Sequence, residues 1–253
     1  MIEILAPKGK TLAWYLTMEE YAARKSCDLS GLNESSSSDE PKSYFFTWVV
    51  EPTVIFGRHQ VMNNEVNLSY CKEHNIAVVQ RKSGGGCVYA DKGNLMLSYI
   101  VESRKSMGES NAQVIFQQFL DRIADVLCSA GLKAVKTEHN DILVDGQKVS
   151  GNACYQLSGN GQDSVVTVVH GTMLYDVDFE HLQNAITPTT EKLQKHGVES
   201  VRQRVRNLRP LLEKTEIQSI EDLAGYITRQ LCKECISLTP EDIEAIDRME
   251  GEK

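Results

Sequence analysis

The chain has 253 residues, 41% of them hydrophobic and 25% charged, and a formal net charge of −8. This length allows the core of one large domain, and the acidic charge argues against sequence-independent nucleic-acid binding, which needs a basic surface. Since no apolar stretch approaches the roughly 18 residues of a membrane-spanning helix, we expect neither a nucleic-acid nor a membrane partner.

The first part of the chain predicts one helix followed by short strands. Apolar residues recur at helical spacing over residues 11–25, and the serine-rich, acidic stretch 26–42 predicts an exposed loop. β-Branched and alternating apolar runs come next, interrupted by a short helix and by a glycine-rich loop. The expected elements are a helix at 65–75 and strands at 44–50, 53–57, 76–80, 86–90 and 94–102.

The second part predicts the clearest helix of the chain, at 110–130, where apolar residues follow helical spacing and Gly131 ends the pattern. Residues 132–175 are rich in strand-forming types. Further helices are expected at 178–186, 217–238 and 240–249. Because strands and helices do not alternate strictly, we predict an α+β fold with a mixed sheet flanked by helices, not a doubly wound parallel sheet.

The glycine-rich loop is the most informative segment. Three consecutive glycines at 84–86 lie between two strand-like runs, with Arg81 and Lys82 just before them. Glycine there allows the backbone to approach a ligand closely or to adopt φ values that other residues resist. With two cationic side chains beside it, the loop predicts a binding site for a small anionic molecule.

A second pattern, at 140–151, predicts a β-hairpin that brings opposite charges together. Asp145-Gly146 is a favoured pair for a type I′ turn, and that turn would pair Leu143 with Lys148 and Asp141 with Ser150. Asp141 and Lys148 would then be diagonal neighbours on one face, roughly 7–8 Å apart. The alternative is an exposed ion pair of little consequence.

The cysteines predict a reducing, intracellular setting. There are seven, an odd number at irregular spacing, and the first residues lack the charged and apolar regions of a secretory signal. Cys232 and Cys235 form a lone CxxC within an expected helix. Without a second pair or a nearby histidine, buried or idle thiols are a better interpretation than a metal or redox site.

Five blocks, in order, resemble the lipoate–protein ligase family. They are Val54-Ile-Phe-Gly-Arg-His-Gln60 with Asn64-Glu-Val-Asn67; the glycine-rich segment Arg81–Asn94; Asn140-Asp141 with Gly146–Ala153; His170-Gly-Thr-Met-Leu174; and Ser200–Asn207. The resemblance implies the mixed-sheet fold shared with biotin ligases and class II synthetases. It also implies a catalytic domain over 1–210, with 211–253 as its helical C-terminal extension and no further accessory domain.

The resemblance further implies a two-step reaction. Lipoate and Mg-ATP would give lipoyl-adenylate and pyrophosphate, and a lysine of an acceptor protein would then attack the adenylate. The implied cofactors are therefore ATP and Mg²⁺, with lipoate as substrate. The implied partners are lipoyl domains of 2-oxo acid dehydrogenase E2 subunits, the glycine-cleavage H protein and, in members without an accessory domain, a separate accessory chain. The implied compartment is the cytoplasm, or an organelle in a eukaryote.

The resemblance also assigns roles to residues. Lys148 would stabilise charge at the carboxylate and α-phosphate, and Asp141 would orient Lys148 or hold Mg²⁺. Val88, Tyr89 and Val149 would line a channel for the lipoyl tail. The residues expected to contact lipoate or the adenylate are Arg81, Ser83, Gly84, Gly85, Gly86, Val88, Tyr89, Asn94, Ser150, Gly151, His170 and Gly171.

Several alternatives remain open at this stage. Family members often have histidine where this chain has Ala90, and those without an accessory domain can be limited to transferring a preformed acyl group. A related octanoyl or lipoyl transferase would need a cysteine thioester, for which Cys87 and Cys154 are candidates. Biotin ligation is disfavoured because the Gly-Arg-Gly-Arg type of loop is missing. A binding module without catalysis is disfavoured by the presence of both Lys148 and Asp141.

Overall fold

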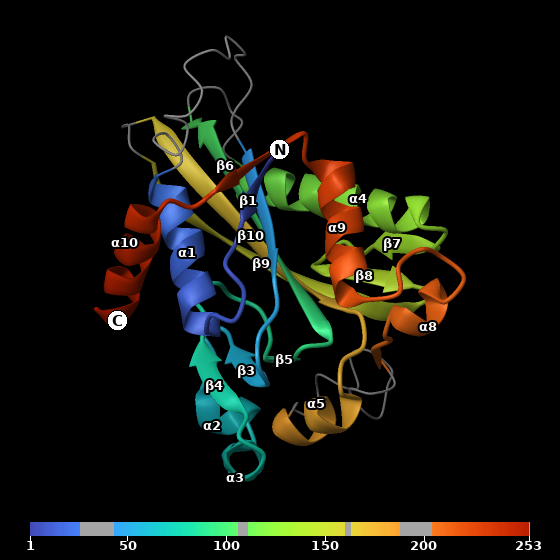
Figure 1. Ribbon diagram of the computed structural model, residues 1–253. Coiled ribbons are helices and arrows are strands. Elements are labelled where there is room, and N and C mark those ends of the chain that lie inside the picture. Colours follow the sequence, from blue (N-terminus) through green and yellow to red (C-terminus); the bar gives the residue numbers. More distant parts are fainter. Residues whose placement is uncertain (26–42, 106–110, 160–162, 188–203, 253) are drawn as a thin grey trace.

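A mixed eight-stranded sheet forms the centre of the computed structural model, which describes residues 1–25, 43–105, 111–159, 163–187 and 204–252 (Figure 1). Its strands are β1 (Ile2–Leu5), β2 (Ser43–Trp48), β6 (Asn94–Arg104), β7 (Ala134–Lys136), β8 (Asp141–Val144), β9 (Gln147–Ser158), β10 (Ser164–Leu174) and β11 (Glu234–Ser237). They are ordered β11-β1-β2-β6-β10-β9-β8-β7. β1 is parallel to β11 and β2, and the remaining pairs are antiparallel. The predicted α+β fold with a mixed sheet is confirmed.

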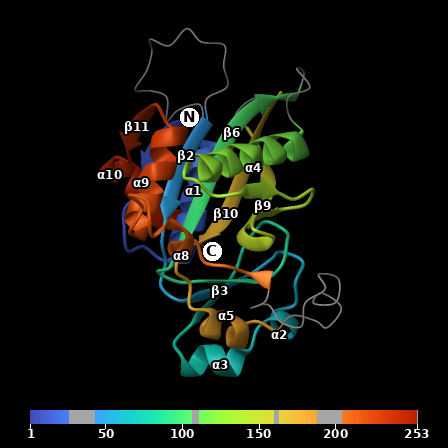
Figure 2. The ribbon, with the colours of Figure 1, turned by 90° about the vertical axis from the view of Figure 1, so that its right-hand side faces the viewer.

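Helices cover both faces of this sheet. α1 (Leu12–Arg24) and α10 (Pro240–Gly251) pack on one face, and α4 (Ala112–Ser129) and α9 (Ile220–Leu231) on the other (Figures 1 and 2). Successive strand residues point to opposite faces: Phe46 of β2 is buried with α1, and Phe45 is buried with α4. The sheet is therefore buried on both sides. The short helix α8 (Arg209–Leu212) packs against the α4 side.

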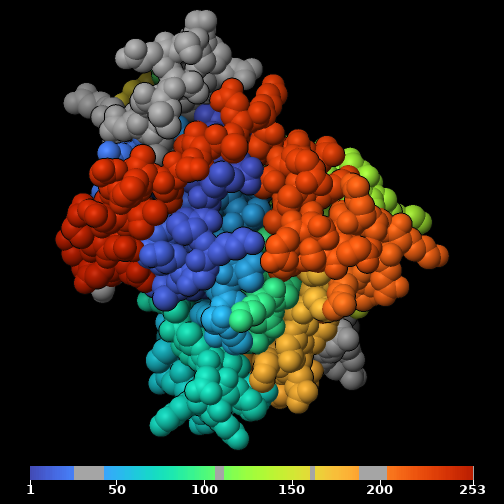
Figure 3. Space-filling model, viewed as in Figure 1, coloured from blue at the N-terminus to red at the C-terminus, as the bar shows by residue number. Residues whose placement is uncertain are grey.

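A smaller lobe lies below the large sheet. Its elements are β3 (Thr53–Phe56), β4 (Ala77–Gln80), β5 (Val88–Ala90), α2 (Met62–Glu65), α3 (Leu68–Glu73) and α5 (Phe179–Ala185). The strands form a separate sheet in the order β4-β3-β5. Val54, Tyr89 and Leu182 belong to its own buried cluster. Figure 3 shows how the segments around 60–80 and 180–187, far apart in sequence, lie side by side at the base of the molecule.

Most of the predicted elements appear within a few residues of the expected bounds. The prediction of one helix over 217–238 is wrong at its end, because α9 stops at Leu231 and the backbone of Cys232 is extended. Residues 234–237 instead form β11, whose hydrogen bonds to β1 satisfy backbone groups that a longer helix would have satisfied internally. After α8, the described part of the predicted helical extension is thus helix, strand and helix. The sequence did not predict β1. The predicted 26–42 loop lies outside the described residues.

Nothing in the described helices is long and apolar enough to cross a bilayer.

Candidate functional site

A cavity of about 750 Å³ opens between the small lobe and the β8–β10 end of the large sheet. Its walls include the glycine loop (Gly85, Gly86), the hairpin residues Asp141 and Lys148, and His170 and Gly171 of β10. Apolar side chains are also part of the lining, among them Leu16, Trp48, Ile55, Val88, Tyr89 and Met96. The cavity therefore combines a polar, cationic part with an apolar part, as a ligand with a charged head and an apolar tail would require.

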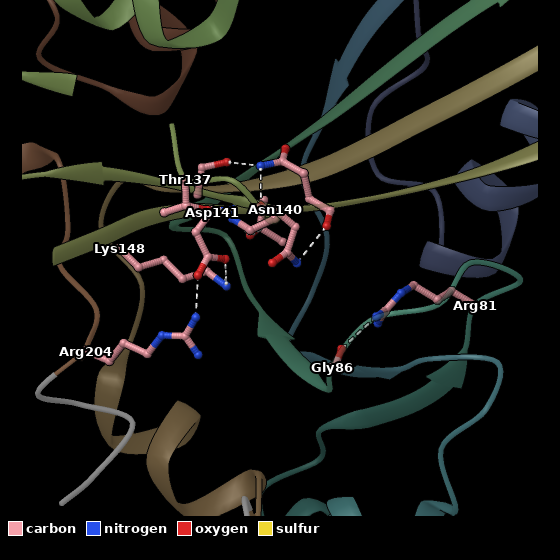
Figure 4. Close-up of polar contacts among 11 residues, drawn as sticks. Arg81, Gly86, Thr137, Asn140, Asp141, Lys148 and Arg204 are labelled. Carbon is pink, nitrogen blue, oxygen red and sulfur yellow. Dashed lines mark hydrogen bonds and ion pairs between the residues drawn. The ribbon is translucent and has the colours of Figure 1, made fainter. Parts of the chain in front are cut away.

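Lys148 and Asp141 form an ion pair at the cavity wall. Lys148 Nζ lies 2.7 Å from Asp141 Oδ1, and the two side chains are only 17% and 9% exposed. Arg204 contacts the second carboxylate oxygen, so that one aspartate is held between two cations (Figure 4). Burial lowers the pKa of Lys148, Asp141 opposes that change, and the charges of Arg204 and Arg81 add to it. Lys148 is a mostly desolvated cation poised beside open space.

The hairpin has the predicted turn but a different register. Asp145 and Gly146 have φ values of 49° and 79°, as a type I′ turn needs. Leu143 pairs with Lys148 as expected, but Asp141 pairs with Gly151 instead of Ser150, because Val149 is an extra residue at a β-bulge. Lys148 and Gly151, three positions apart, thus share a face, which a regular strand does not allow.

The bulge decides which neighbours the site has. A Cβ on Gly151 would lie 2.4 Å from Lys148 Nζ, so the lysine occupies the space that this glycine leaves. Val149 is fully buried with Ile142 and Val144 in the core and does not border the cavity, so the expectation that it lines an acyl channel is wrong. Ser150 is also fully buried, and its hydroxyl accepts a hydrogen bond from Asn152.

Arg81 shapes the glycine loop from inside. Its guanidinium donates to the carbonyl oxygens of Ile55, Gly84 and Gly86 at 2.7–3.2 Å and to Ser83 Oγ at 3.1 Å. The side chain is buried, which lowers its pKa. Gly85 adopts a φ of 90°, a value that favours glycine. Arg81 borders the cavity with its guanidinium hydrogen-bonded to the loop, so it adds positive charge to this wall of the cavity.

The other expected contact residues divide into two groups. Val88, Tyr89, Gly85, Gly86, Gly151, His170 and Gly171 border the cavity. Ser83, Gly84, Asn94 and Ser150 do not, and the three non-glycine members of this group are at most 1% exposed. Asn94, at the start of β6, has no hydrogen-bond partner for its amide group among the described residues. Ala90 is buried in the core and does not border the cavity.

The sequence-based prediction missed several residues of the site. Arg204 lies in the block Ser200–Asn207, of which 204–207 are described, but nothing in its sequence context indicates that it contacts Asp141. Leu16, Trp48 and Met96 belong to amphipathic patterns that indicate core packing. Glu19 lies within an expected helix and is fully buried against His170. The one sequence signal for the role of Glu19 was its position, as a charged residue, within an amphipathic helix pattern.

The donors present do not suit a protein-held Mg²⁺ at Asp141. Both oxygens of this carboxylate already face a cation, and a third cation would be repelled by them. In the described part of the chain, no three His, Cys, Asp or Glu side chains gather as a metal site would need. The expectation that Asp141 holds the metal is not supported by this geometry, and its contacts fit the alternative role of orienting Lys148.

Comparisons with known proteins define the class. The family model described as lipoyl protein ligase A/B catalytic domain matches residues 16–231, and the chain belongs to this family. It is 35% identical over 216 residues to lipoate–protein ligase 1 of Staphylococcus aureus, covering 84% of this chain and 62% of the relative. It is 33% identical over 193 residues to the lipoate–protein ligase LplJ of Bacillus subtilis, covering 76% and 54%. The chain thus spans between half and two thirds of the length of these relatives.

Solved structures agree on the fold. The chain superposes with a TM-score of 0.76, at 22% identity, on a structure described as a bipartite lipoate protein ligase of Thermoplasma acidophilum, covering 100% of this chain and 92% of that one. A structure described as lipoate-protein ligase A bound with ATP gives a TM-score of 0.74 at 20% identity, covering 100% and 95%. The predicted family and its mixed-sheet fold are confirmed.

Proposed function

We propose that this chain activates lipoate with ATP and transfers the lipoyl group to a lysine of a lipoyl-accepting protein. In the first step a lipoate carboxylate oxygen attacks the α-phosphorus of ATP and pyrophosphate leaves. In the second step the acceptor amine attacks the acyl carbon, an amide forms, a proton is lost and AMP leaves. The observation that supports this most is a half-buried lysine, paired with Asp141, at a cavity whose lining combines cationic and apolar side chains.

The residues would divide the work. Lys148 Nζ would face the carboxylate and the α-phosphate and stabilise the negative charge that develops between them. Asp141, fixed by Arg204, would keep the lysine charged and aimed. Leu16, Trp48 and Met96 would surround the apolar tail. Mg²⁺ would enter with the ATP phosphates, since it commonly binds through few protein carboxylates and keeps several waters.

Names of related proteins support the choice of ligands. One neighbour is described with bound lipoic acid, one with ATP and one together with its E2 lipoyl domain. We therefore propose lipoate and ATP as substrates and E2 lipoyl domains as acceptors, with the glycine-cleavage H protein as a further candidate. Transfer of a preformed acyl group, or adenylation that needs a separate chain, is the second candidate, because one structural neighbour is described as a bipartite lipoate protein ligase.

Intact-mass measurement of a lipoyl domain incubated with this chain, lipoate and Mg-ATP tests the proposal. A mass gain equal to one lipoyl group on one lysine is expected, and it should disappear with Lys148→Ala but persist with Lys136→Ala. Lys136 is a matched control, because it pairs with Asp121 outside the cavity. Modification by Lys148→Ala at the normal rate would contradict the role of this lysine.

A second experiment separates the two candidates. Pyrophosphate exchange into ATP with lipoate reports the first step, and transfer from synthetic lipoyl-adenylate reports the second. Exchange without added proteins supports the full reaction, whereas transfer without exchange leaves the transferase alone. Cys87 borders the cavity and is not in a disulfide, so Cys87→Ser tests thioester chemistry. Full transfer by this variant would exclude a thioester at Cys87, and Cys154→Ser makes the same test at the other candidate cysteine.

A further inference from the structure

A chain of hydrogen bonds runs behind the cavity from α1 to the glycine loop. Glu19 of α1 is fully buried, and its Oε2 lies 2.9 Å from His170 Nδ1. His170 Nε2 lies 2.6 Å from Ser83 Oγ, and Arg81 Nε lies 3.1 Å from the same oxygen. Three distant parts of the sequence are thereby joined through four side chains.

With His170 as a neutral imidazole, the partners assign a direction to every bond. Arginine can only donate, so Ser83 Oγ accepts from Arg81, and its own proton is available for His170 Nε2. His170 Nε2 is then the acceptor nitrogen, and Nδ1–H donates to Glu19. The other carboxylate oxygen accepts from Ser98 Oγ at 2.6 Å. Glu19 therefore accepts from His170 on one carboxylate oxygen and from Ser98 on the other.

Arg81 is the residue through which this series of hydrogen bonds reaches the cavity. It holds the carbonyl oxygens of Gly84 and Gly86, so its orientation sets the shape of the loop that walls the cavity. In the described part of the chain no carboxylate forms an ion pair with Arg81 directly. Glu19 supplies negative charge to it only through His170 and Ser83.

The order serine, histidine, carboxylate is also that of a nucleophilic triad. Ser83, however, is only 1% exposed and does not border the cavity. Its oxygen also accepts a hydrogen bond from Arg81, which makes it a weaker nucleophile. The geometry therefore favours positioning over covalent catalysis.

We propose that Glu19 is a positioning residue that acts through His170 and Ser83 on Arg81, and so holds the glycine loop in its ligand-ready shape. Lipoate as the ligand rests on the proposed function, but the control of the loop by Glu19 does not. Loss of the carboxylate should loosen the loop and weaken the binding of the acyl ligand, without removing any group that touches the ligand's head.

The test combines amide hydrogen exchange at residues 82–88 with titration of lipoate, in the variants Glu19→Ala, Glu19→Gln and Ser83→Ala. Glu19→Ala should raise both the loop exchange rate and the Kd for lipoate by roughly tenfold or more, as expected for the loss of a charge-assisted hydrogen bond. Glu19→Gln should be intermediate, since its amide oxygen still accepts from His170 Nδ1–H. Thr17→Val, a buried polar loss on the same helix, should leave loop exchange unchanged.

The double variant Glu19→Ala/Ser83→Ala separates the proposed chain from two independent effects. Residues that act through one series of hydrogen bonds give non-additive changes in loop exchange and in Kd. The double variant should therefore be no worse than the more severe single variant. Additive effects, or unchanged loop exchange in both Glu19→Ala and Glu19→Gln, would overturn the proposal. If the parent chain binds no lipoate, the proposed function fails, while the exchange data still decide the role of Glu19.

Discussion

Gly151→Ala is the substitution whose effect the structure defines most closely. The added Cβ would lie 2.4 Å from Lys148 Nζ and 2.7 Å from Cε, where ordinary contact begins at 3.4 Å. The ammonium must therefore retreat by about 1 Å. Because the atoms in the way are the far end of a flexible side chain, the cost to folding should be about 1 kcal/mol, that of an off-rotamer lysine. A misplacement of about 1 Å at a reacting group can cost about 100-fold in rate, or roughly 2.7 kcal/mol of barrier.

Single-turnover formation of lipoyl-adenylate, followed as pyrophosphate release, measures that loss, and thermal unfolding measures stability. We expect Gly151→Ala to be slowed about 100-fold while remaining folded. Gly251→Ala is the matched control, because a Cβ there meets no atom within 4 Å and the residue ends α10, away from the cavity. Adenylation by Gly151→Ala at the parent rate would refute the inferred role of the Lys148 position.

Three further predictions concern the surroundings of this lysine. Arg204→Gln should lower turnover by about tenfold or more, since Asp141 would then orient Lys148 without its second cationic partner. Arg206→Gln is the control. It loses only an exposed ion pair at the hairpin turn and should have little effect on turnover. The reaction needs Lys148 as an ammonium, so kcat/KM should fall at high pH as Lys148 loses its proton. Asp141 raises the pKa of Lys148, so Asp141→Asn should move this fall to lower pH. Arg204 lowers the same pKa, so Arg204→Gln should move the fall to higher pH. Val149→Ala should reduce the free energy of unfolding by about 2 kcal/mol in a denaturant titration and leave the KM for lipoate unchanged; a raised KM would restore Val149 to the channel.

The hairpin shows how far local sequence could carry the prediction. Asp145-Gly146 determined the turn, and the pairing of Leu143 with Lys148 followed from it. The bulge at Val149 could not be predicted in this way. Val149 is buried in the core, whereas Lys148 and Gly151 lie together on the opposite face of β9. This arrangement depends on tertiary packing and could not be inferred from the local sequence.

Residues far apart in sequence account for most of what was missed. Glu19 and Arg204 join the site through contacts across 151 and 63 positions, respectively, and neither lies in a local pattern that indicates its partner. The residues of β11 were predicted as helix because their sequence neighbours are helical. They form a strand instead because they hydrogen-bond to β1, more than 200 residues away in the sequence. The tertiary partner, and not local propensity, decided its structure.

The pairing of β1 with β11 has a consequence for the order of assembly during synthesis. β1 has two register pairs with β2 and four with β11, the first joining Ile2 to Glu234. Its main partner therefore leaves the ribosome more than 200 residues after β1 itself, while the strands of the hairpin that carries Lys148 are made earlier. Contacts of such long sequence separation form slowly. β1 is thus expected to complete its hydrogen bonding late, since its pairs with β11 cannot form before residues 234–237 have emerged.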